Sequence, residues 1–510
     1  MTKQEPREQI LGEQSAIASP KRRKSSFADD VLKLVTGTTF AQLLAILAAP
    51  VLTRLYAPDA FGILALFTSI TGILGVIACM RYELSIMLPE KDEEAANLLG
   101  ASMAFVILVS LLTVPLVWWG KDPVIRWLNA PGLAPYLWLV PVMVFIHGVF
   151  LALNYWNSRT KHFGRLSIAR VTSALTTTTG KLGVGFMGYA TAGTMIGATV
   201  AGQAVATSVL GGQIWRDDRK IFLKSIRWKE MCKGIVRHKK FPLLSSWSSL
   251  MNTISVQLPP LLLAFFFSST IVGFYALGHR LLSMPMSLIG SSIAQVFFQR
   301  AAEAKNQGAL HSVVRNTFIR LVALGAFPLI LIMIGGKDFF SVIFGSQWAE
   351  AGIYAQILAP WILFVFLGSP MSTLFSVLEM QEAGLFFNII LLITRVASLV
   401  IGGLTGSILL ALLLYAGTGT VIWCGLCLYL LSKAGLTINL LYRDVSRLVA
   451  IALAALFPVI FMKGCGTQSL YIVIAGCLSA LFYYMIQYIY DEEMQKLLKH
   501  FTGRLLSRKK

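Results

Sequence analysis

Apolar segments of about twenty residues, separated by short polar turns, follow one another along almost the whole chain. A helix of about 20 apolar residues crosses the roughly 30 Å of hydrocarbon in a bilayer. This pattern predicts about fourteen membrane-spanning helices, arranged as six, six and a final pair. The predicted spans are 31–53, 61–80, 97–119, 135–156, 166–187, 190–213, 241–266, 270–298, 314–335, 352–377, 384–403, 406–431, 447–463 and 468–490.

A short internal similarity indicates that the two sets of six spans are repeats. Residues 61–66, FGILAL, share three identities with residues 272–277, VGFYAL, which lie 211 positions later. The same offset maps the start of the first span onto the start of the seventh. Because six crossings precede the second copy, both copies enter the membrane from the same side, and a pseudo-two-fold axis along the membrane normal should relate them. The predicted fold class is an all-α polytopic membrane protein with two six-helix lobes and two C-terminal helices.

Shifts in composition divide the chain into six segments. Both ends are polar and basic, and a further basic stretch separates the two sets of six spans. The predicted segments are a disordered tail (1–26), a first lobe (27–215), a basic loop (216–240), a second lobe (241–432), two further spans (433–490) and a basic tail (491–510).

Composition and charge exclude several classes of protein. With 56% hydrophobic residues, 13% charged residues and a mean hydropathy of +0.70, the chain is too apolar for a soluble globule. If the N-terminus is cytoplasmic, about 33 of the 44 Lys and Arg residues fall on the cytoplasmic side. This asymmetry predicts an even number of spans with both termini in the cytoplasm. The net charge of +20 then reflects topology and contact with anionic lipid headgroups, and no nucleic acid partner is required.

Five charged residues are candidates for binding a substrate. Arg280 and Arg395 lie near the middle of predicted spans, where a cation needs water, a partner or an anionic ligand. Lys181 lies near the external end of its span, and Arg81 and Glu83 lie at the foot of the second span, where they could simply pair with each other. Hardly any carboxylate is available inside the spans, so an anionic substrate in a wet cleft between the lobes is the favoured interpretation.

Other motifs point away from catalysis and metal binding. Arg170 and Arg320 lie near cytoplasmic span ends, where long basic side chains commonly reach the interface. No Walker A, HExxH or GxSxG pattern occurs, and the six cysteines are scattered, so we expect no enzyme and no metal site. The predicted external connections, near 120–134 and 336–351, are short for a catalytic domain.

Residues 55–99, LYAPDAFGILALFTSITGILGVIACMRYELSIMLPEKDEEAANLL, closely resemble the N-terminal signature of Wzx-type oligosaccharide flippases. These are polysaccharide biosynthesis proteins of the multidrug/oligosaccharidyl-lipid/polysaccharide exporter superfamily. The helix at 276–290 also resembles one in lipid II flippases, in which an arginine matching Arg280 lines the central cavity. A cavity arginine in the first span of those relatives has no match here.

The resemblance implies that the chain moves undecaprenyl-pyrophosphate-linked oligosaccharides across the cytoplasmic (inner) membrane of a bacterium or archaeon by alternating access. Arg280 would attract the anionic headgroup, assisted by Arg395 and Arg81. A polysaccharide polymerase and a chain-length regulator are the implied protein partners. No cofactor is expected, and the coupling ion, H⁺ or Na⁺, stays open because the spans hold no acid cluster.

Three other functions compete with this interpretation. A drug exporter of the same superfamily would need carboxylates in the cleft to bind cationic drugs, and the spans offer few. A lipid II flippase is disfavoured by the Wzx-type opening stretch. A membrane polymerase or ligase acting on the same lipid-linked sugars would need acid and base groups in a substantial external loop.

Overall fold

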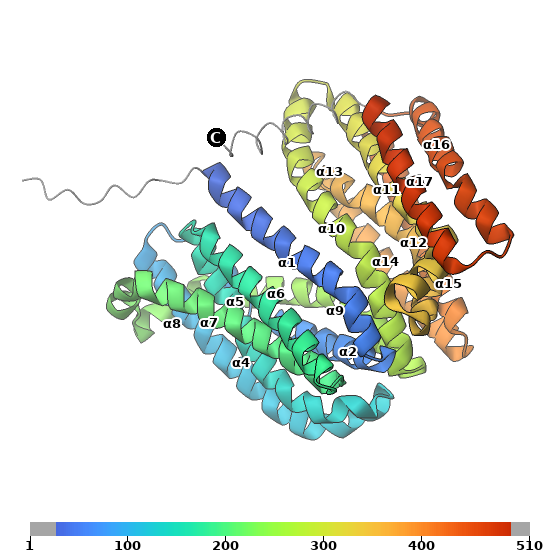
Figure 1. The fold of residues 1–510 in the computed structure, drawn as a ribbon. Helices are drawn as coiled ribbons and strands as arrows, with labels where there is room; N and C mark the ends of the chain where they lie inside the picture. Colours follow the sequence, from blue (N-terminus) through green and yellow to red (C-terminus); the bar gives the residue numbers. More distant parts are fainter. Residues whose placement is uncertain (1–26, 491–510) are drawn as a thin grey trace, which may run out of the picture.

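The computed structural model describes residues 27–490, without side-chain detail for 27–35, 285–289, 291–292, 438–440 and 490. The two predicted terminal tails, 1–26 and 491–510, lie outside the described residues. Within the described range the chain is helical and forms no β-strand. Figure 1 shows the earlier helices grouped on one side of the molecule and the later ones on the other.

The helices from α1 to α7 pack mainly against one another and form the first lobe. A short helix, α8, leads from this lobe to the second. The bounds are α1 Phe27–Leu55, α2 Pro58–Gly75, α3 Tyr82–Ser85, α4 Asp92–Trp127, the 3₁₀ segment η1 Pro131–Leu139, α5 Val140–Arg159, α6 Phe163–Phe186, α7 Ala192–Ser225 and α8 Trp228–Arg237.

The second lobe begins with a π-helical turn, and a hairpin of two helices packs against its outer side along α11. Figure 1 shows this hairpin, α16 and α17, in red at the edge of the molecule. The bounds are η2 Phe241–Ser245, α9 Ser246–Phe266, α10 Ser269–Asn306, α11 Leu310–Phe344, η3 Ser346–Trp348, α12 Ala349–Met371, α13 Leu374–Val377, α14 Gln381–Leu404, α15 Ile408–Lys433, α16 Ile438–Gly464 and α17 Ser469–Tyr490.

The described residues form fourteen helices of at least 18 residues, and these correspond to the predicted spans in order. Twelve described segments are long and apolar enough to cross a membrane. α6 and α10 are outside these twelve, so the multi-pass helical fold is confirmed but the count of fourteen spans is not. The predicted boundaries between the six segments of the chain stay predictions.

Two stretches differ from the sequence-based expectation. The second span was predicted to continue to residue 80, but α2 ends at Gly75, and Met80 and Arg81 adopt positive φ angles of 49° and 62°. The stretch 216–240 is not a loop, because α7 continues to Ser225 and α8 follows at once. The Asn97 amide of α4 holds the bend between them: it donates to the Ser225 carbonyl and accepts from the Arg227 N–H, both at 2.9 Å.

The two lobes meet where α2 crosses α10, at the matching glycines of the predicted repeat. A Cβ on Gly62 would lie 1.7 Å from the carbonyl oxygen of Ser269, and a Cβ on Gly273 would lie 2.0 Å from that of Pro58. Ser269 follows Pro58 by 211 positions, as Gly273 follows Gly62. Gly62 and Gly273 are equivalent positions of the two repeats, and so are Pro58 and Ser269. Each glycine therefore contacts the repeat-equivalent of the residue that the other glycine contacts, as expected for elements that meet across a two-fold axis.

Hydrogen bonds repeat this reciprocity at the end of the molecule where α1 turns into α2, which we call the turn end. In the first lobe, the Asn129 side chain donates to the Phe267 carbonyl at the end of α9, at 3.0 Å. In the second lobe, the side chains of Gln347 and Trp348 donate to the Thr53 carbonyl near the end of α1, at 2.7 and 2.8 Å. Each lobe thus binds the end of the other lobe's first long helix.

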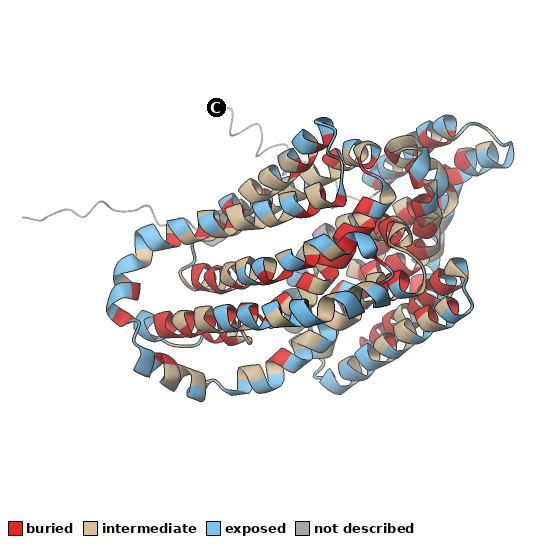
Figure 2. Cartoon of the chain, turned by 90° about the horizontal axis from the view of Figure 1, so that it is seen from below, coloured by how far each residue is buried: buried red, intermediate tan, exposed pale blue. Residues whose placement is uncertain are grey.

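Among the described side chains, the buried ones show that the lobes share a core at the turn end. One hydrophobic cluster contains residues of both lobes, among them Phe67, Tyr275 and Trp348. Toward the opposite end, where the described chain begins and ends, the first lobe has its own cluster around Trp156 and the second has one around Phe318. Figure 2 shows exposed residues on the outer faces and buried ones where helices meet. The molecule is therefore joined at the turn end and divides toward the other.

We predict that Gly273→Ala lowers the free energy of unfolding by about 1–3 kcal/mol, because its Cβ must push α2 and α10 apart. Thermal unfolding of the purified protein in detergent measures this effect. Gly417→Ala in α15 is the matched control, since open space surrounds that glycine. Alanine there should leave stability unchanged or raise it by up to about 1 kcal/mol. Equal melting temperatures for Gly273→Ala and Gly417→Ala would contradict the close contact between α2 and α10 at Gly273.

Candidate functional site

A cavity of about 620 Å³ lies between the helices of the first lobe and the part of α10 from Ala276 to Met284. Four helices of the first lobe, α1, α2, α6 and α7, supply most of its wall, and one side chain comes from α5. α10 closes the side that faces the second lobe. The cavity predicted between two equal lobes is therefore displaced into the first lobe.

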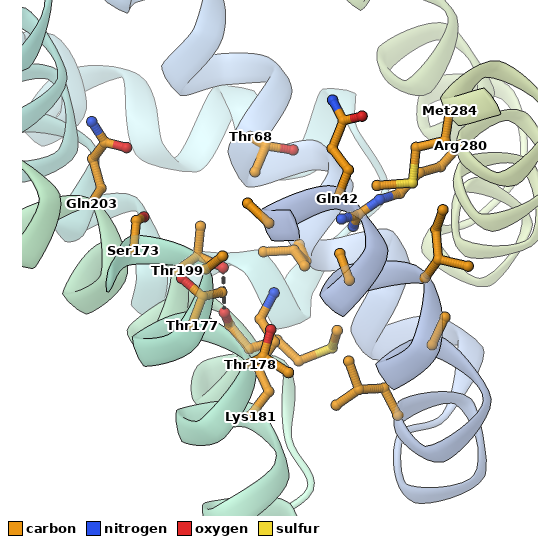
Figure 3. Close-up of a pocket in the computed structure, with 18 of the residues that line it drawn as sticks. Gln42, Thr68, Ser173, Thr177, Thr178, Lys181, Thr199, Gln203, Arg280 and Met284 are labelled. Carbon is orange, nitrogen blue, oxygen red and sulfur yellow. Dashed lines mark hydrogen bonds between the residues drawn. The ribbon is translucent and has the colours of Figure 1, made fainter. Parts of the chain in front are cut away.

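Three basic side chains line this cavity. Arg170 and Lys181 come from α6, and Arg280 comes from α10. Figure 3 shows Arg280 and Lys181 approaching the cavity from opposite sides. Lys181 is 7% exposed, whereas the Arg280 side chain is exposed to the cavity. No Asp or Glu is among the described residues of the wall, so the cavity is positively charged.

Uncharged hydrogen-bonding side chains surround the cations. Hydroxyl and amide groups both donate and accept, so they suit a ligand rich in hydroxyl groups. Figure 3 shows several of them around the open space. The uncharged polar residues of the wall are Thr38, Gln42, Thr68, Ser173, Thr177, Thr178, Thr199 and Gln203.

Close packing positions α6, which carries two of the three cations. A Cβ on Gly202 of α7 would lie 1.9 Å from the Thr177 hydroxyl oxygen, so only glycine lets α7 approach here. The Tyr56 hydroxyl donates to the Lys181 carbonyl oxygen at 2.7 Å and holds α6 against the corner between α1 and α2. The guanidinium of Arg170 donates to the Thr38 hydroxyl at 2.9 Å, which ties the other half of α6 to α1.

Two neighbouring residues of α10 belong to different surroundings. Arg280 lines the cavity of the first lobe. The ring of His279 stacks on Tyr275 at 5.5 Å and on Trp361 at 5.7 Å, measured between ring centroids, within the second lobe. α10 is thus the wall between the cavity and this aromatic cluster.

Arg395 belongs to the same aromatic cluster and does not line the cavity. Its guanidinium donates to the Ser255 hydroxyl at 3.3 Å and lies 5.8 Å from the centre of the Trp361 ring. An arginine over an indole face gains a cation–π attraction, which partly offsets the loss of water. The structure therefore separates Arg395 from Arg280 by α10.

Arg81 and Glu83 also lie away from the cavity, in the irregular stretch after α2. Their side chains form an ion pair at 3.2 Å, and Glu83 is completely buried. Burial raises the pKa of Glu83 above its usual range, while its own backbone and the Arg81 guanidinium oppose the rise. The next residue, Tyr82, donates its hydroxyl to the Ile235 carbonyl of α8 at 3.0 Å. This pair therefore lies beside the connection between the lobes.

The structure thus brings together two of the five candidate residues, Lys181 and Arg280. A role in substrate binding for Arg395, Arg81 and Glu83 stays a prediction without support from their positions. Arg170 was interpreted as a residue reaching the interface, but it lines the cavity. A signal for it was present: the helix that carries Arg170 and Lys181 also contains four consecutive threonines, 176–179, which is unusually polar for a span.

A family model described as "Polysaccharide biosynthesis protein" matches residues 51–352, more than half of the chain. The chain belongs to this family of polysaccharide biosynthesis proteins. The matched region contains every cavity-lining residue of α2, α6, α7 and α10.

Two curated proteins are similar to the chain in sequence. Teichuronic acid biosynthesis protein TuaB of Bacillus subtilis (strain 168) is 22% identical over 275 residues, which cover 53% of this chain and 55% of that protein. Lipopolysaccharide biosynthesis protein WzxC of Escherichia coli (strain K12) is 23% identical over 280 residues, covering 54% and 55%. The alignments span about half the length of these curated relatives.

Solved transporters share the fold of this family member. Lipid II flippase MurJ, in an inward closed conformation, superposes with a TM-score of 0.68 at 13% identity and covers 91% of this chain and 98% of its own. A multidrug resistance MATE family transporter of the MOP superfamily, in an inward-facing conformation, gives a TM-score of 0.61 at 14% identity, covering 77% and 94%. The fold is therefore that of a multi-pass membrane transporter.

We predict that Lys181→Met stabilises this polysaccharide biosynthesis protein by about 1–3 kcal/mol. Methionine removes a buried cation that forms no ion pair among the described residues and is repelled by Arg280. Thermal unfolding in detergent tests this. Lys229→Met on the exposed surface of α8 should change stability by less than about 0.5 kcal/mol. A destabilised Lys181→Met protein would show that the lysine has a structural partner instead.

The Glu83 carboxyl predicts a pH-dependent difference in stability. Because its pKa is higher in the folded protein than in the unfolded chain, the protonated form contributes stability that is lost as the pH rises through the folded pKa. Glu83→Gln should therefore melt at a higher temperature than the wild type at about pH 8, and the difference should shrink toward about pH 4. Glu90→Gln, exposed in the same loop, is the control. If the melting temperatures of the wild type and Glu83→Gln changed with pH in parallel, the raised pKa of Glu83 in the folded protein would be contradicted.

Proposed function

We propose that the chain is a flippase that moves lipid-linked oligosaccharides across the cytoplasmic membrane for the synthesis of a surface polysaccharide. Membership of the polysaccharide biosynthesis family and the names of the two curated relatives support this activity. The transporter fold supports movement of a substrate rather than its chemical conversion. Undecaprenyl pyrophosphate is the carrier lipid that we propose.

The observation that carries the proposal is the positive cavity with no carboxylate in its described wall. A cation inside a membrane protein is costly unless water or an anion compensates it. A pyrophosphate between Arg280 and Lys181 would supply that compensation, with charge-assisted hydrogen bonds to both side chains. The adjoining threonine, serine and glutamine side chains would bind sugar hydroxyl groups.

The same charge argues against the rival functions. A cationic drug would be repelled by Arg170, Lys181 and Arg280, so a drug exporter is disfavoured although the fold resembles one. The cavity wall also lacks the pair of acidic side chains with which glycoside chemistry is commonly carried out. Transport of an anionic lipid headgroup is the function that this cavity fits best.

Alternating access is the proposed mechanism. The lobes are joined at the turn end by the Gly62 and Gly273 contact and by reciprocal hydrogen bonds. The positive-inside rule supports an orientation in which the opposite end, and both termini, lie in the cytoplasm. The headgroup would enter from there, and separation of the lobes at the turn end would release it to the far leaflet, where a polymerase and a chain-length regulator would act on it.

Transport should depend on the charge at residue 280. We expect Arg280→Ala to abolish transport and Arg280→Lys to retain part of it, because lysine keeps the charge but loses the bidentate geometry. Cells in which the chain is the only route for its substrate should accumulate the lipid-linked glycan on the cytoplasmic side, identified by mass spectrometry. Proteoliposomes with a lectin outside measure the translocation directly.

The matched control is Arg300→Ala, which removes an arginine from the exposed part of the same helix. It should leave transport within about twofold of the wild type. Full activity of Arg280→Ala would remove this arginine, and with it the proposed headgroup site, from the mechanism.

A further inference from the structure

A second cavity, of about 240 Å³, lies near the turn end between α4 and the pair formed by α2 and α9. Both lobes contribute to it, because α9 belongs to the second lobe. It does not share any residue with the positive cavity. The residues that line it are Ile70, Leu74, Leu116, Val117, Gly120, Lys121, Val124, Trp127, Leu128, Leu137, Val140 and Leu261.

The wall of this second cavity is almost wholly apolar. Aliphatic side chains, one glycine and one tryptophan make up all of it except Lys121. An apolar cavity of about 150 Å³ stays dry and binds benzene, so a cavity of 240 Å³ has room for a longer hydrocarbon segment. An apolar wall of this kind favours a hydrocarbon chain, and it lacks the hydroxyl and amide side chains that would bind a sugar.

Lys121 adds one positive charge to this otherwise apolar wall. Exposed tryptophans surround it in this part of the molecule: Trp118, Trp119 and Trp127 on α4, and Trp138 on η1. Tryptophans of this kind gather at the membrane–water interface. Among the described residues, no carboxylate forms an ion pair with Lys121. The ammonium group is thus available to an anion at the interface, directly beside an apolar chamber.

We infer that this cavity binds the end of a polyprenyl phosphate, with part of its hydrocarbon chain between α4 and α9 and its phosphate on Lys121. A single chain fits the single chamber and the single cation better than the two chains of a glycerophospholipid do. The identity of the lipid rests on the proposed function, because that function requires such a lipid in the leaflet at the turn end.

The position of the cavity gives the bound chain a mechanical consequence. Leu261 of the second lobe faces a wall that otherwise belongs to the first lobe. When the lobes separate at the turn end, this wall must move away from α2 and α4. Occupancy by a chain would therefore favour the joined arrangement, and loss of the chain would accompany separation.

The experiment measures binding of undecaprenyl phosphate to the full-length chain in nanodiscs by native mass spectrometry. It is done with the Arg280→Ala variant as the parent chain, so that the positive cavity contributes less to binding and its remaining contribution is the same in every variant compared. Val124→Trp should fill the chamber and weaken binding at least about tenfold. Lys121→Gln, a milder change that folding should tolerate, should weaken binding about tenfold through loss of the phosphate contact.

Two further ligands and two control variants make the test specific. Undecaprenol, which has no phosphate, should bind the Arg280→Ala parent chain and its Lys121→Gln derivative equally. Phosphatidic acid should bind at least about tenfold more weakly than undecaprenyl phosphate. The controls are Leu112→Trp and Arg126→Gln, exposed positions of α4 outside the cavity, which should bind as the parent chain does.

Equal binding of phosphatidic acid, or undiminished binding to both Val124→Trp and Lys121→Gln, would overturn the inference. A photoreactive undecaprenyl phosphate should cross-link to α2, α4 or α9, and cross-links confined to other helices would also overturn it. Failure of the proposed function is a separate result, because it would be seen as normal transport by Arg280→Ala and would not alter the binding data.

Discussion

The contact between Gly62 and Gly273 is the constraint on which the rest of the structure depends. With no side chain at either position, α2 and α10 approach until backbone atoms of one helix face backbone atoms of the other. The contact relates equivalent positions of two repeats, so it fixes where the symmetry axis passes. It also creates the shared hydrophobic core at the turn end, and it leaves the opposite ends of the lobes with cores of their own.

Symmetry of the backbone coexists with asymmetry of chemistry. The first lobe holds a positively charged cavity on one side of α10, whereas on the other side of α10 the second lobe is packed with the rings of Tyr275, His279 and Trp361. Arg395 lies among these rings, and Arg280 faces the cavity. Two arginines that look equivalent in hydropathy therefore differ in what compensates them: an aromatic face in one case, and water or an anionic ligand in the other.

The sequence was sufficient for those features that depend on hydropathy and spacing. The order of the long helices, the sharp turn before Pro58, and the repeat at an offset of 211 positions all follow from local pattern. The break at Gly75 was missed because an apolar run continues beyond it, and hydropathy does not show that a Cβ there would lie 2.9 Å from the His147 ring of α5. The cavity position of Arg170 was missed for a related reason, since closeness to a span end does not show which face of the helix meets a neighbour.

Because His279 and Arg280 are adjacent, α10 is held on both of its sides: by the aromatic cluster of the second lobe and by the cavity of the first. Any rotation that turned the guanidinium out of the first lobe would also pull the imidazole from between its two aromatic neighbours. A twist of α10 that moved Arg280 out of the positive cavity would therefore disrupt the packing of the second lobe, at a substantial cost in free energy. The two lobes should consequently move as rigid bodies, and α10 should not rotate about its own axis relative to the second lobe.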